Sequence, residues 1–200
     1  MKKHIFFLLL TAAATVSFRL PAFIDIGAKL PKGDVKMKDV SGKEVSMNEA
    51  KKANGLLVMF SCNTCPYVAR NQDRTRAICQ FAQKNNIGVI LINSNEAARS
   101  AGDSYEAMQA YARQQSYNWL YVVDKDNQVA DAFNADRTPE CYLFNKDLTL
   151  VYKGAIDDNP GSAGDVKEKY LHAAIQAMIA GKPAPVPSTA SVGCGIKRKM

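Results

Sequence analysis

Histidines and paired cysteines, the usual ligands of structural zinc, are scarce in this sequence. Its 200 residues include two histidines, His4 and His172, and a single pair of closely spaced cysteines, Cys62 and Cys65. A structural zinc site needs four such ligands, usually as two pairs with this spacing. The missing second pair argues against zinc as the use of these cysteines, and we expect the protein to hold neither a metal ion nor a cofactor.

The sequence also lacks an apolar run long enough to cross a membrane as a helix. Its longest candidate, residues 5–18, has about 14 residues, whereas a span needs about 20. Lys2 and Lys3 precede this run, and a basic start before a short apolar run is typical of a secretory signal peptide. We therefore predict a signal peptide at residues 1–22, with cleavage between residues 14 and 22; an uncleaved anchor is the alternative.

Export defines where we expect the mature protein to work. No cysteine lies directly after the apolar run, so we expect no acceptor for a lipid anchor there. We expect no membrane span after cleavage, and a location in the periplasm or cell envelope, with secretion less favoured.

No basic patch of the kind that binds nucleic acid is evident. The chain has 26 basic and 19 acidic residues and a net charge of +7. Part of the surplus lies at Lys197, Arg198 and Lys199, and elsewhere charges of both signs intermingle without interleaved aromatic residues. A nucleic-acid surface requires clustered Lys and Arg, so we expect no nucleic-acid partner.

Length and composition favour one globular domain. Hydrophobic residues make up 47% of the chain and charged residues 22%, which is an ordinary globular composition with room for a single core. We expect this domain over residues 23–181. Residues 182–200 are Pro-rich and then Gly-rich, and we expect them to form a flexible tail with little to pack, containing Cys194.

Apolar runs predict strands that alternate with helices. Residues 55–60 and 87–92 are continuous apolar runs typical of strands buried on both faces, and the stretch between them has helical spacing. This order predicts a strand-helix-strand unit of an α/β fold. The other expected elements are a hairpin in 34–47, a helix at 104–115 opened by a capping box at 103–106, a strand at 119–123, a helix at 127–133, hairpin strands at 140–144 and 148–152, and a helix at 165–180.

The cysteine pair lies where the first buried strand gives way to a helix. Free N–H groups at a helix start stabilise a thiolate, which is the nucleophile of disulfide exchange. We expect Cys62, at the strand end, to be the attacking thiol, and Cys65, one turn inward, to be the resolving thiol with the higher pKa. A purely structural disulfide is the alternative, but a two-residue loop constrains the unfolded chain little.

Several segments together resemble the thioredoxin superfamily, and most closely its peroxiredoxin-like branch of the alkyl hydroperoxide reductase and thiol-specific antioxidant type, with a Cys-X-X-Cys motif. The segments are Ser-Cys-Asn-Thr-Cys-Pro-Tyr-Val at 61–68, Ile-Asn-Ser-Asn-Glu at 92–96, Arg-Thr-Pro-Glu at 137–140, Tyr-Lys-Gly-Ala-Ile-Asp-Asp-Asn at 152–159, and Gly-Lys-Pro-Ala-Pro-Val-Pro-Ser-Thr with Val-Gly-Cys-Gly-Ile-Lys after it.

The resemblance implies a thioredoxin-like fold, in which helices flank a central mixed β-sheet, with a peroxiredoxin-like helix and strand inserted at 104–134. It also implies that Pro139 is a cis-proline facing the cysteine pair. Thr138 and Pro139 would then expose backbone that pairs with a substrate segment.

The sequence departs from the thioredoxin pattern near the motif. Ser61 stands in place of the usual Trp, Asn63 and Thr64 replace Gly-Pro, and no acidic residue lies in the strand before Cys62. The usual buried proton acceptor is therefore missing. Glu140 is a candidate replacement, although a solvated carboxylate at a strand start is the favoured interpretation.

The three remaining cysteines receive different predictions. Cys79 shares a helical face with apolar residues, which favours an inert core thiol. Cys141 lies just past the proposed cis-proline, and its pattern leaves open whether it is buried or approaches the pair. Cys194 could fold back as a resolving thiol or join another chain, and the sequence does not choose between them.

These observations favour an exported thiol-disulfide oxidoreductase. We expect Cys62 and Cys65 to exchange disulfides with partner proteins of the cell envelope through mixed disulfides. An unidentified electron donor or acceptor would then restore the starting redox state of the pair. A thiol peroxidase in which Cys65 reacts with peroxide is the main alternative, and a non-enzymatic binding module of the same fold is a third.

Overall fold

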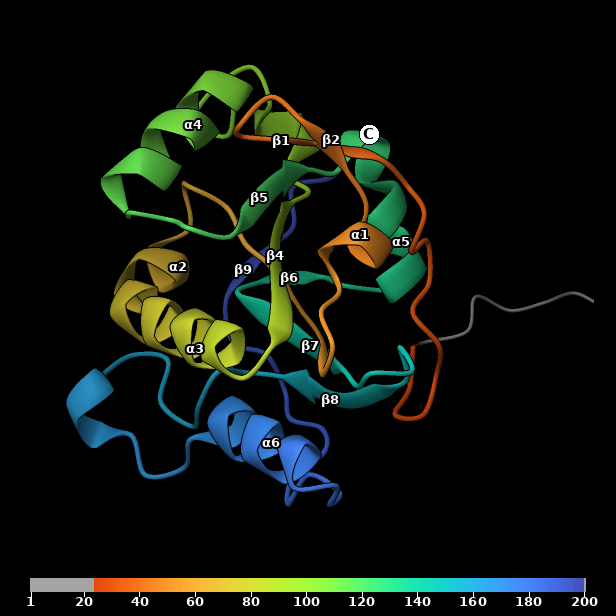
Figure 1. Ribbon diagram of the computed structural model, residues 1–200. Coiled ribbons are helices and arrows are strands. Elements are labelled where there is room, and N and C mark those ends of the chain that lie inside the picture. Colours follow the sequence, from red (N-terminus) through yellow and green to blue (C-terminus); the bar gives the residue numbers. More distant parts are fainter. Residues whose placement is uncertain (1–23, 200) are drawn as a thin grey trace, which may run out of the picture.

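The computed structural model describes residues 24–199, so the predicted signal peptide lies outside the described residues. A seven-stranded sheet forms its centre, in the order β2-β1-β5-β4-β3-β7-β8 (Figure 1). The strands are β1 (Met37–Asp39), β2 (Glu44–Val45), β3 (Gly55–Phe60), β4 (Ile87–Asn93), β5 (Leu120–Val123), β7 (Glu140–Phe144) and β8 (Leu150–Gly154). Two further short strands, β6 (Arg137–Thr138) and β9 (Cys194–Gly195), pair with each other outside this sheet.

The sheet is mixed, and its parallel part is the most deeply buried. β4 runs parallel to β3 and to β5, while β7 pairs antiparallel with β3 and β8 with β7. Every residue of β3 and β4 is buried, which explains their unbroken apolar sequences, because helices cover both faces of a parallel sheet.

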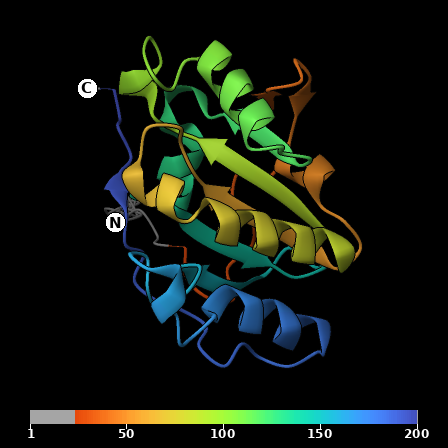
Figure 2. The ribbon, with the colours of Figure 1, turned by 90° about the vertical axis from the view of Figure 1, so that its left-hand side faces the viewer.

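Helices cover both faces of the sheet. α2 (Pro66–Arg70), α3 (Gln72–Lys84), α4 (Tyr105–Gln114) and α6 (Tyr170–Ile179) lie on the face turned toward the viewer in Figure 2. On the opposite face lie α1 (Met47–Ala50) and α5 (Gln128–Phe133). Three 3-10 turns complete the elements: η1 (Glu96–Ala98), η2 (Lys125–Asn127) and η3 (Ala163–Asp165).

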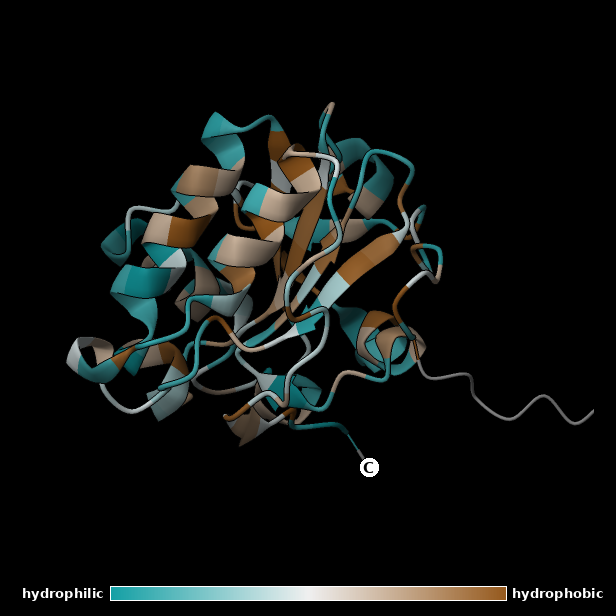
Figure 3. Cartoon of the chain, turned by 90° about the horizontal axis from the view of Figure 1, so that it is seen from below, coloured by the Kyte–Doolittle hydropathy of each residue, from teal (hydrophilic) through white to brown (hydrophobic). Residues whose placement is uncertain are grey.

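Each face of the sheet has its own apolar core, and the central strands stand out in brown in Figure 3. Alternate residues of a strand point to opposite faces, so Leu57 and Met59 pack with α3, α4 and α6, whereas Leu56 and Val58 pack with α1 and α5. Together with the inserted α4 and β5, this arrangement confirms the predicted thioredoxin-like α/β fold.

Several element boundaries differ from those predicted. The N-cap of α4 is Ser104, whose side chain accepts the N–H of Ala107, so the capping box expected at 103–106 is absent. α6 begins at Tyr170, five residues later than expected, after the 3-10 turn η3. The connection between β7 and β8 is longer than predicted, closing through a hydrogen bond from the N–H of Asn145 to the carbonyl of Thr149 (3.0 Å).

The C-terminal residues are packed, which corrects the prediction of a flexible tail. Ser188 forms a bridge with Lys153, and the N–H of Thr189 donates to the Lys153 carbonyl (3.0 Å). Farther along, Ile196 is buried in the core beside α1 and α5. No helix among residues 24–199 is long and apolar enough to cross a membrane.

Candidate active site

The two motif cysteines lie at the edge where β3 ends. The N–H of Ser61 still donates to Ile92 of β4 (2.9 Å), and the chain then turns so that Cys65 becomes the N-cap of α2 and Pro66 its first residue. Proline fits there because the N–H it lacks would have no partner within the helix. Cys62 is 1% exposed and Cys65 is 2% exposed, so both sulfur atoms lie beneath the surface.

Thr138 contacts both thiols from the opposite side. Its hydroxyl lies 3.4 Å from the Cys62 sulfur, and its carbonyl accepts a hydrogen bond from the Cys65 thiol (3.2 Å). The peptide bond between Thr138 and Pro139 is cis, as the family resemblance implied. Two thiols and the backbone before a cis-proline thus meet at one point of the fold.

The two thiols differ in acidity, in the order opposite to our expectation. The pKa of Cys65 is lowered, first by the neighbouring Cys62 thiol, and further by the Cys194 thiol and the backbone N–H groups of Val68 and Cys194. The pKa of Cys62 is raised, first by its interaction with Cys65 and then by burial. This order is the reverse of our expectation that Cys62 is the more acidic thiol: the contact between the two thiols favours negative charge on Cys65, which lies at the start of α2.

A buried carboxylate that the sequence analysis missed holds the loop between the cysteines. Asp103 is 0% exposed, and it accepts hydrogen bonds from the N–H of Asn63 (2.7 Å) and the hydroxyl of Thr64 (2.9 Å). The side-chain amides of Asn93 and Asn95 donate to the same carboxylate (3.0 and 2.9 Å). Its negative charge also contributes to the raised pKa of Cys62.

We call Asp103, with the hydrogen bonds that hold this loop, the carboxylate clamp. In the sequence, the clamp is indicated by the polar residues that bond to Asp103. A buried apolar strand that ends in Asn-Ser-Asn at 93–95 places three hydrogen-bonding side chains in the interior, where each needs a partner. Asp103 satisfies two of them, and Arg99 closes the group by donating to the carbonyls of Asn93 (2.8 Å) and Asp103 (2.7 Å). Asp103 had been assigned to a helix cap, which hid this role.

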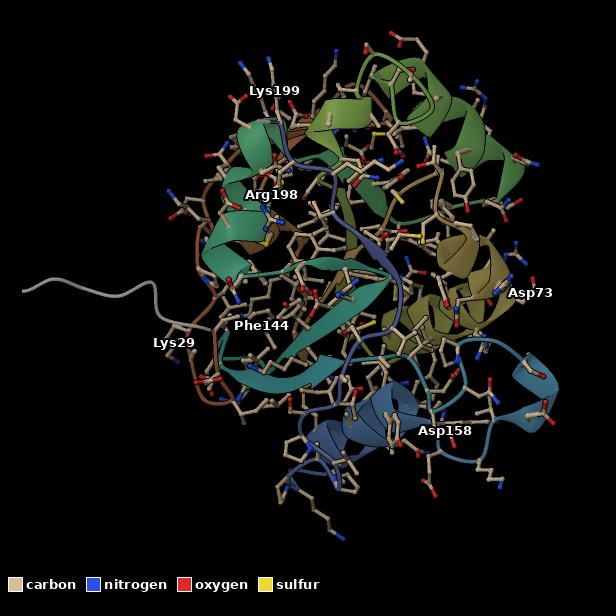
Figure 4. The ribbon with its side chains drawn as sticks, turned by 180° about the vertical axis from the view of Figure 1, so that it is seen from behind. Lys29, Asp73, Phe144, Asp158, Arg198 and Lys199 are labelled. Carbon is tan, nitrogen blue, oxygen red and sulfur yellow. The ribbon has the colours of Figure 1, made fainter. Side chains whose placement is uncertain are left out.

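Cys194 reaches the same site from the C-terminal end of the chain. β9 pairs antiparallel with β6, with Cys194 opposite Thr138 and Gly195 opposite Arg137. The sulfur atoms of Cys194 and Cys65 lie 2.6 Å apart. Figure 4 shows the C-terminal segment crossing the rear of the molecule from α6 to Arg198 and Lys199 beside α5.

The structure does not bring the remaining candidates to the thiols. Glu140 accepts from the N–H groups of Asp136 and Arg137 (3.1 and 3.3 Å), and burial raises its pKa. Cys141 and Cys79 are fully buried in the core beside α3 and α6, and burial raises the pKa of both. Among residues 24–199, no group of histidine, cysteine and acidic side chains could hold a metal ion.

Comparison with known proteins places this site in a family. Residues 26–153 match the AhpC/TSA family. A search of curated proteins finds no match to the chain. Among solved structures, an uncharacterized conserved protein from Geobacillus kaustophilus is 31% identical, with a TM-score of 0.82 over 88% of this chain and 94% of that one. A hypothetical protein from Sinorhizobium meliloti 1021 is 30% identical, with a TM-score of 0.80 over 89% of this chain and 97% of that one.

More distant structures share the fold alone. The thioredoxin domain of a thiol-disulfide oxidoreductase from Bacteroides vulgatus is 17% identical, with a TM-score of 0.54 over 64% of this chain and 87% of that one. Peroxidoxin BcpB from Mycobacterium tuberculosis is 11% identical, with a TM-score of 0.54 over 78% of this chain and 95% of that one.

Proposed function

Because the chain belongs to the AhpC/TSA family of thioredoxin-fold redox proteins, we propose that it exchanges disulfides with other proteins through Cys62 and Cys65. One observation carries the proposal. The backbone at Thr138, beside both thiols, pairs with an extended segment that presents a cysteine to Cys65. A substrate protein that takes the place of β9 on this edge would present its own disulfide in the same way.

The position of Cys65 at the start of α2, in contact with the cysteine that β9 presents, and its lowered pKa assign the steps. Cys65, with the lowered pKa, is the thiolate that attacks a substrate disulfide; a bond forms from its sulfur to one substrate sulfur, and the other leaves as a thiolate. Cys62 then attacks the Cys65 sulfur, transferring its proton to the departing substrate thiolate. The products are a reduced substrate and a Cys62–Cys65 disulfide, and the reverse sequence oxidises a substrate.

Thiol peroxidase activity is the second candidate, and the lowered pKa of Cys65 favours it. Cys65 is the position at which a peroxidase of this family would react with peroxide, and a thiolate is the form that peroxide oxidises. Against it, no arginine contacts either thiol among the hydrogen bonds and ion pairs of residues 24–199, so no arginine cation is placed there to bind the peroxide.

Two assays with the purified protein separate these functions. We expect wild type to accelerate the reduction of insulin disulfides by dithiothreitol, and Cys65→Ser to lose this acceleration. Consumption of hydrogen peroxide without insulin reduction would replace our proposal with the peroxidase. Inactivity of the wild type in both assays would favour a binding module.

We further propose that the exchange occurs in the periplasm or cell envelope, with protein thiols and disulfides as partners. The basic start and short apolar run of residues 1–22 support export. Intact-mass analysis of protein from the envelope fraction tests this, since a chain shortened by 14 to 22 residues is expected and a full-length, membrane-embedded chain would contradict it.

A further inference from the structure

The C-terminal segment from Ser188 to Arg198, which we call the C-terminal strap, is held on both sides of its cysteine. Before Cys194, the Thr189 hydroxyl accepts the N–H of Ala155 (2.9 Å). After it, the N–H of Ile196 donates to the backbone carbonyl of Asp136 (2.9 Å). The N–H of Lys197 donates to the side-chain oxygen of Asn95, and the Lys197 carbonyl accepts the N–H of Ala97, both at 2.9 Å. The strap ends in an ion pair from Arg198 to Asp131 (2.8 Å). These contacts fix the position of Cys194.

Gly193 lets the strap lie directly against the site. A Cβ atom at this position would stand 2.1 Å from the carbonyl oxygen of Thr138, a distance that real Cβ contacts do not reach. The carbonyl is backbone and cannot move aside as a side chain could. Residue 193 must therefore be glycine for Cys194 to pair with Thr138 and meet Cys65.

Cys194 also differs from the motif cysteines in its access to solvent. Cys62 and Cys65 are buried, whereas Cys194 is partly exposed. The strap covers the substrate-binding edge at Thr138, so a partner protein meets the Cys194 sulfur before it can meet the motif cysteines.

We propose that Cys194 is a third redox residue of this protein, forming a disulfide with Cys65 and passing electrons between the buried pair and an external protein dithiol. The inference rests on the proposed disulfide exchange. The two sulfur atoms already lie 2.6 Å apart, so no rearrangement of the backbone is needed to bond them.

Each step balances in atoms and electrons. From the Cys62–Cys65 disulfide, the Cys194 thiolate attacks the Cys65 sulfur, the bond to Cys62 breaks, and Cys62 takes up the proton that Cys194 released. No net electrons move in this step. A thiolate of the external dithiol then attacks Cys194, Cys65 leaves as a thiolate, and the second external thiol releases Cys194. The dithiol becomes a disulfide as the Cys65–Cys194 disulfide becomes two thiols.

The leaving group suits the second step, in which the external dithiol releases Cys65. A thiol with a low pKa leaves faster in disulfide exchange, and Cys65 is the group displaced when the external dithiol attacks Cys194. The neighbouring Cys62 thiol, the Cys194 thiol and two backbone N–H groups all lower the pKa of Cys65.

Disulfide mapping of the full protein tests the proposal. The protein is oxidised in mixtures of oxidised and reduced dithiothreitol, alkylated with iodoacetamide and digested with trypsin. A Cys65–Cys194 disulfide joins the peptides 53–70 and 170–197, whereas a Cys62–Cys65 disulfide lies within the first peptide. Cys79 and Cys141, buried in the core, serve as internal controls that should remain unlinked.

We expect Cys62→Ser to link peptides 53–70 and 170–197 within one chain, and Cys194→Ser to form only the disulfide within 53–70. Gly193→Ala should slow the cross-link by about tenfold or more, because proximity of the thiols is lost. Gly164→Ala is the matched control: its added Cβ has no neighbour within 4 Å, so the rate of cross-linking should not change.

Two results would overturn the proposal. The first is a Cys62→Ser protein in which Cys65 is oxidised but Cys194 either remains a free thiol, and is therefore alkylated, or forms a disulfide only with another chain. The second is equal cross-linking in the two glycine variants. The cross-link is read by mass and needs no turnover, whereas the proposed function is tested by insulin reduction. A failure of one can therefore be distinguished from a failure of the other.

Discussion

Replacing Asp103 with asparagine tests the carboxylate clamp on the cysteine loop. One oxygen of Asp103 accepts the N–H of Asn63 and the amide of Asn93, and asparagine retains both bonds through its own oxygen. The second oxygen accepts the hydroxyl of Thr64 and the amide of Asn95. In Asp103→Asn an NH₂ group replaces this oxygen and faces two donors.

The magnitude follows from what those two donors can do. The Thr64 hydroxyl can rotate and accept a hydrogen bond, but the Asn95 amide cannot turn, because its oxygen already accepts the N–H of Lys197 (2.9 Å). One buried donor is therefore left without a partner, which costs about 1–3 kcal/mol. For a chain of this size that is a loss of about 2–12 °C in Tm, at about 2–4 °C per kcal/mol.

Urea unfolding of wild type, Asp103→Asn and Asp73→Asn measures this effect. Asp73 is the matched control, since its side chain is 94% exposed and pairs only with Arg76 on the same helix; its replacement should change the free energy of unfolding by less than about 0.5 kcal/mol. Because the charge of Asp103 raises the pKa of Cys62, Asp103→Asn should also make Cys62 react with iodoacetamide at lower pH. Equal stabilities of the two variants would refute the clamp.

Two further predictions concern a buried ion pair and the pH dependence of the site. Arg74 donates to both oxygens of Asp157 at 2.7 Å, and the two side chains are 15% and 4% exposed. Arg74→Gln should therefore lower the free energy of unfolding by about 3–5 kcal/mol, because it leaves the Asp157 carboxylate buried without its partner. A loss below about 1 kcal/mol in urea unfolding would contradict this prediction. The lowered pKa of Cys65 means that its iodoacetamide labelling rate should stay constant as pH falls below about 8.5 and decline only through the folded-state pKa. A rate that drops tenfold per pH unit directly below about 8.5 would show an ordinary thiol.

The buried strands were predictable from sequence because their signal is local. The unbroken apolar runs of β3 and β4 leave few alternatives to strands covered on both faces. Helix boundaries were less predictable. When several adjacent polar residues could cap a helix, the N-cap is the one whose side chain is not already bonded to a distant part of the chain. Asp103 and Ser104 illustrate this: the carboxylate bonds to a loop 40 residues away, and the hydroxyl caps α4.

The site was predictable in its residue types and not in its arrangement. Spacing identified Cys62 and Cys65, but their acidities depend on which of them becomes the N-cap of α2 and on a thiol 129 residues away in sequence. The Pro-rich composition before Cys194 suggested a free tail. Pairing between β6 and β9 is a long-range contact of only two residues in each strand, too short to leave a pattern in either segment.

The central claim, that Cys65 is the attacking thiolate of a disulfide-exchange site, is tested most directly by adduct formation with glutathione disulfide at neutral pH. In the double variant Cys62→Ser with Cys194→Ser, no neighbouring thiol remains to resolve the mixed disulfide, while each serine hydroxyl can donate to Cys65 in place of the lost thiol. Intact mass should then show one glutathione on Cys65, formed rapidly, whereas Cys65→Ser with Cys194→Ser should remain unmodified at Cys62 over the same time. A rapid adduct on Cys62 together with an unreactive Cys65 would contradict the account.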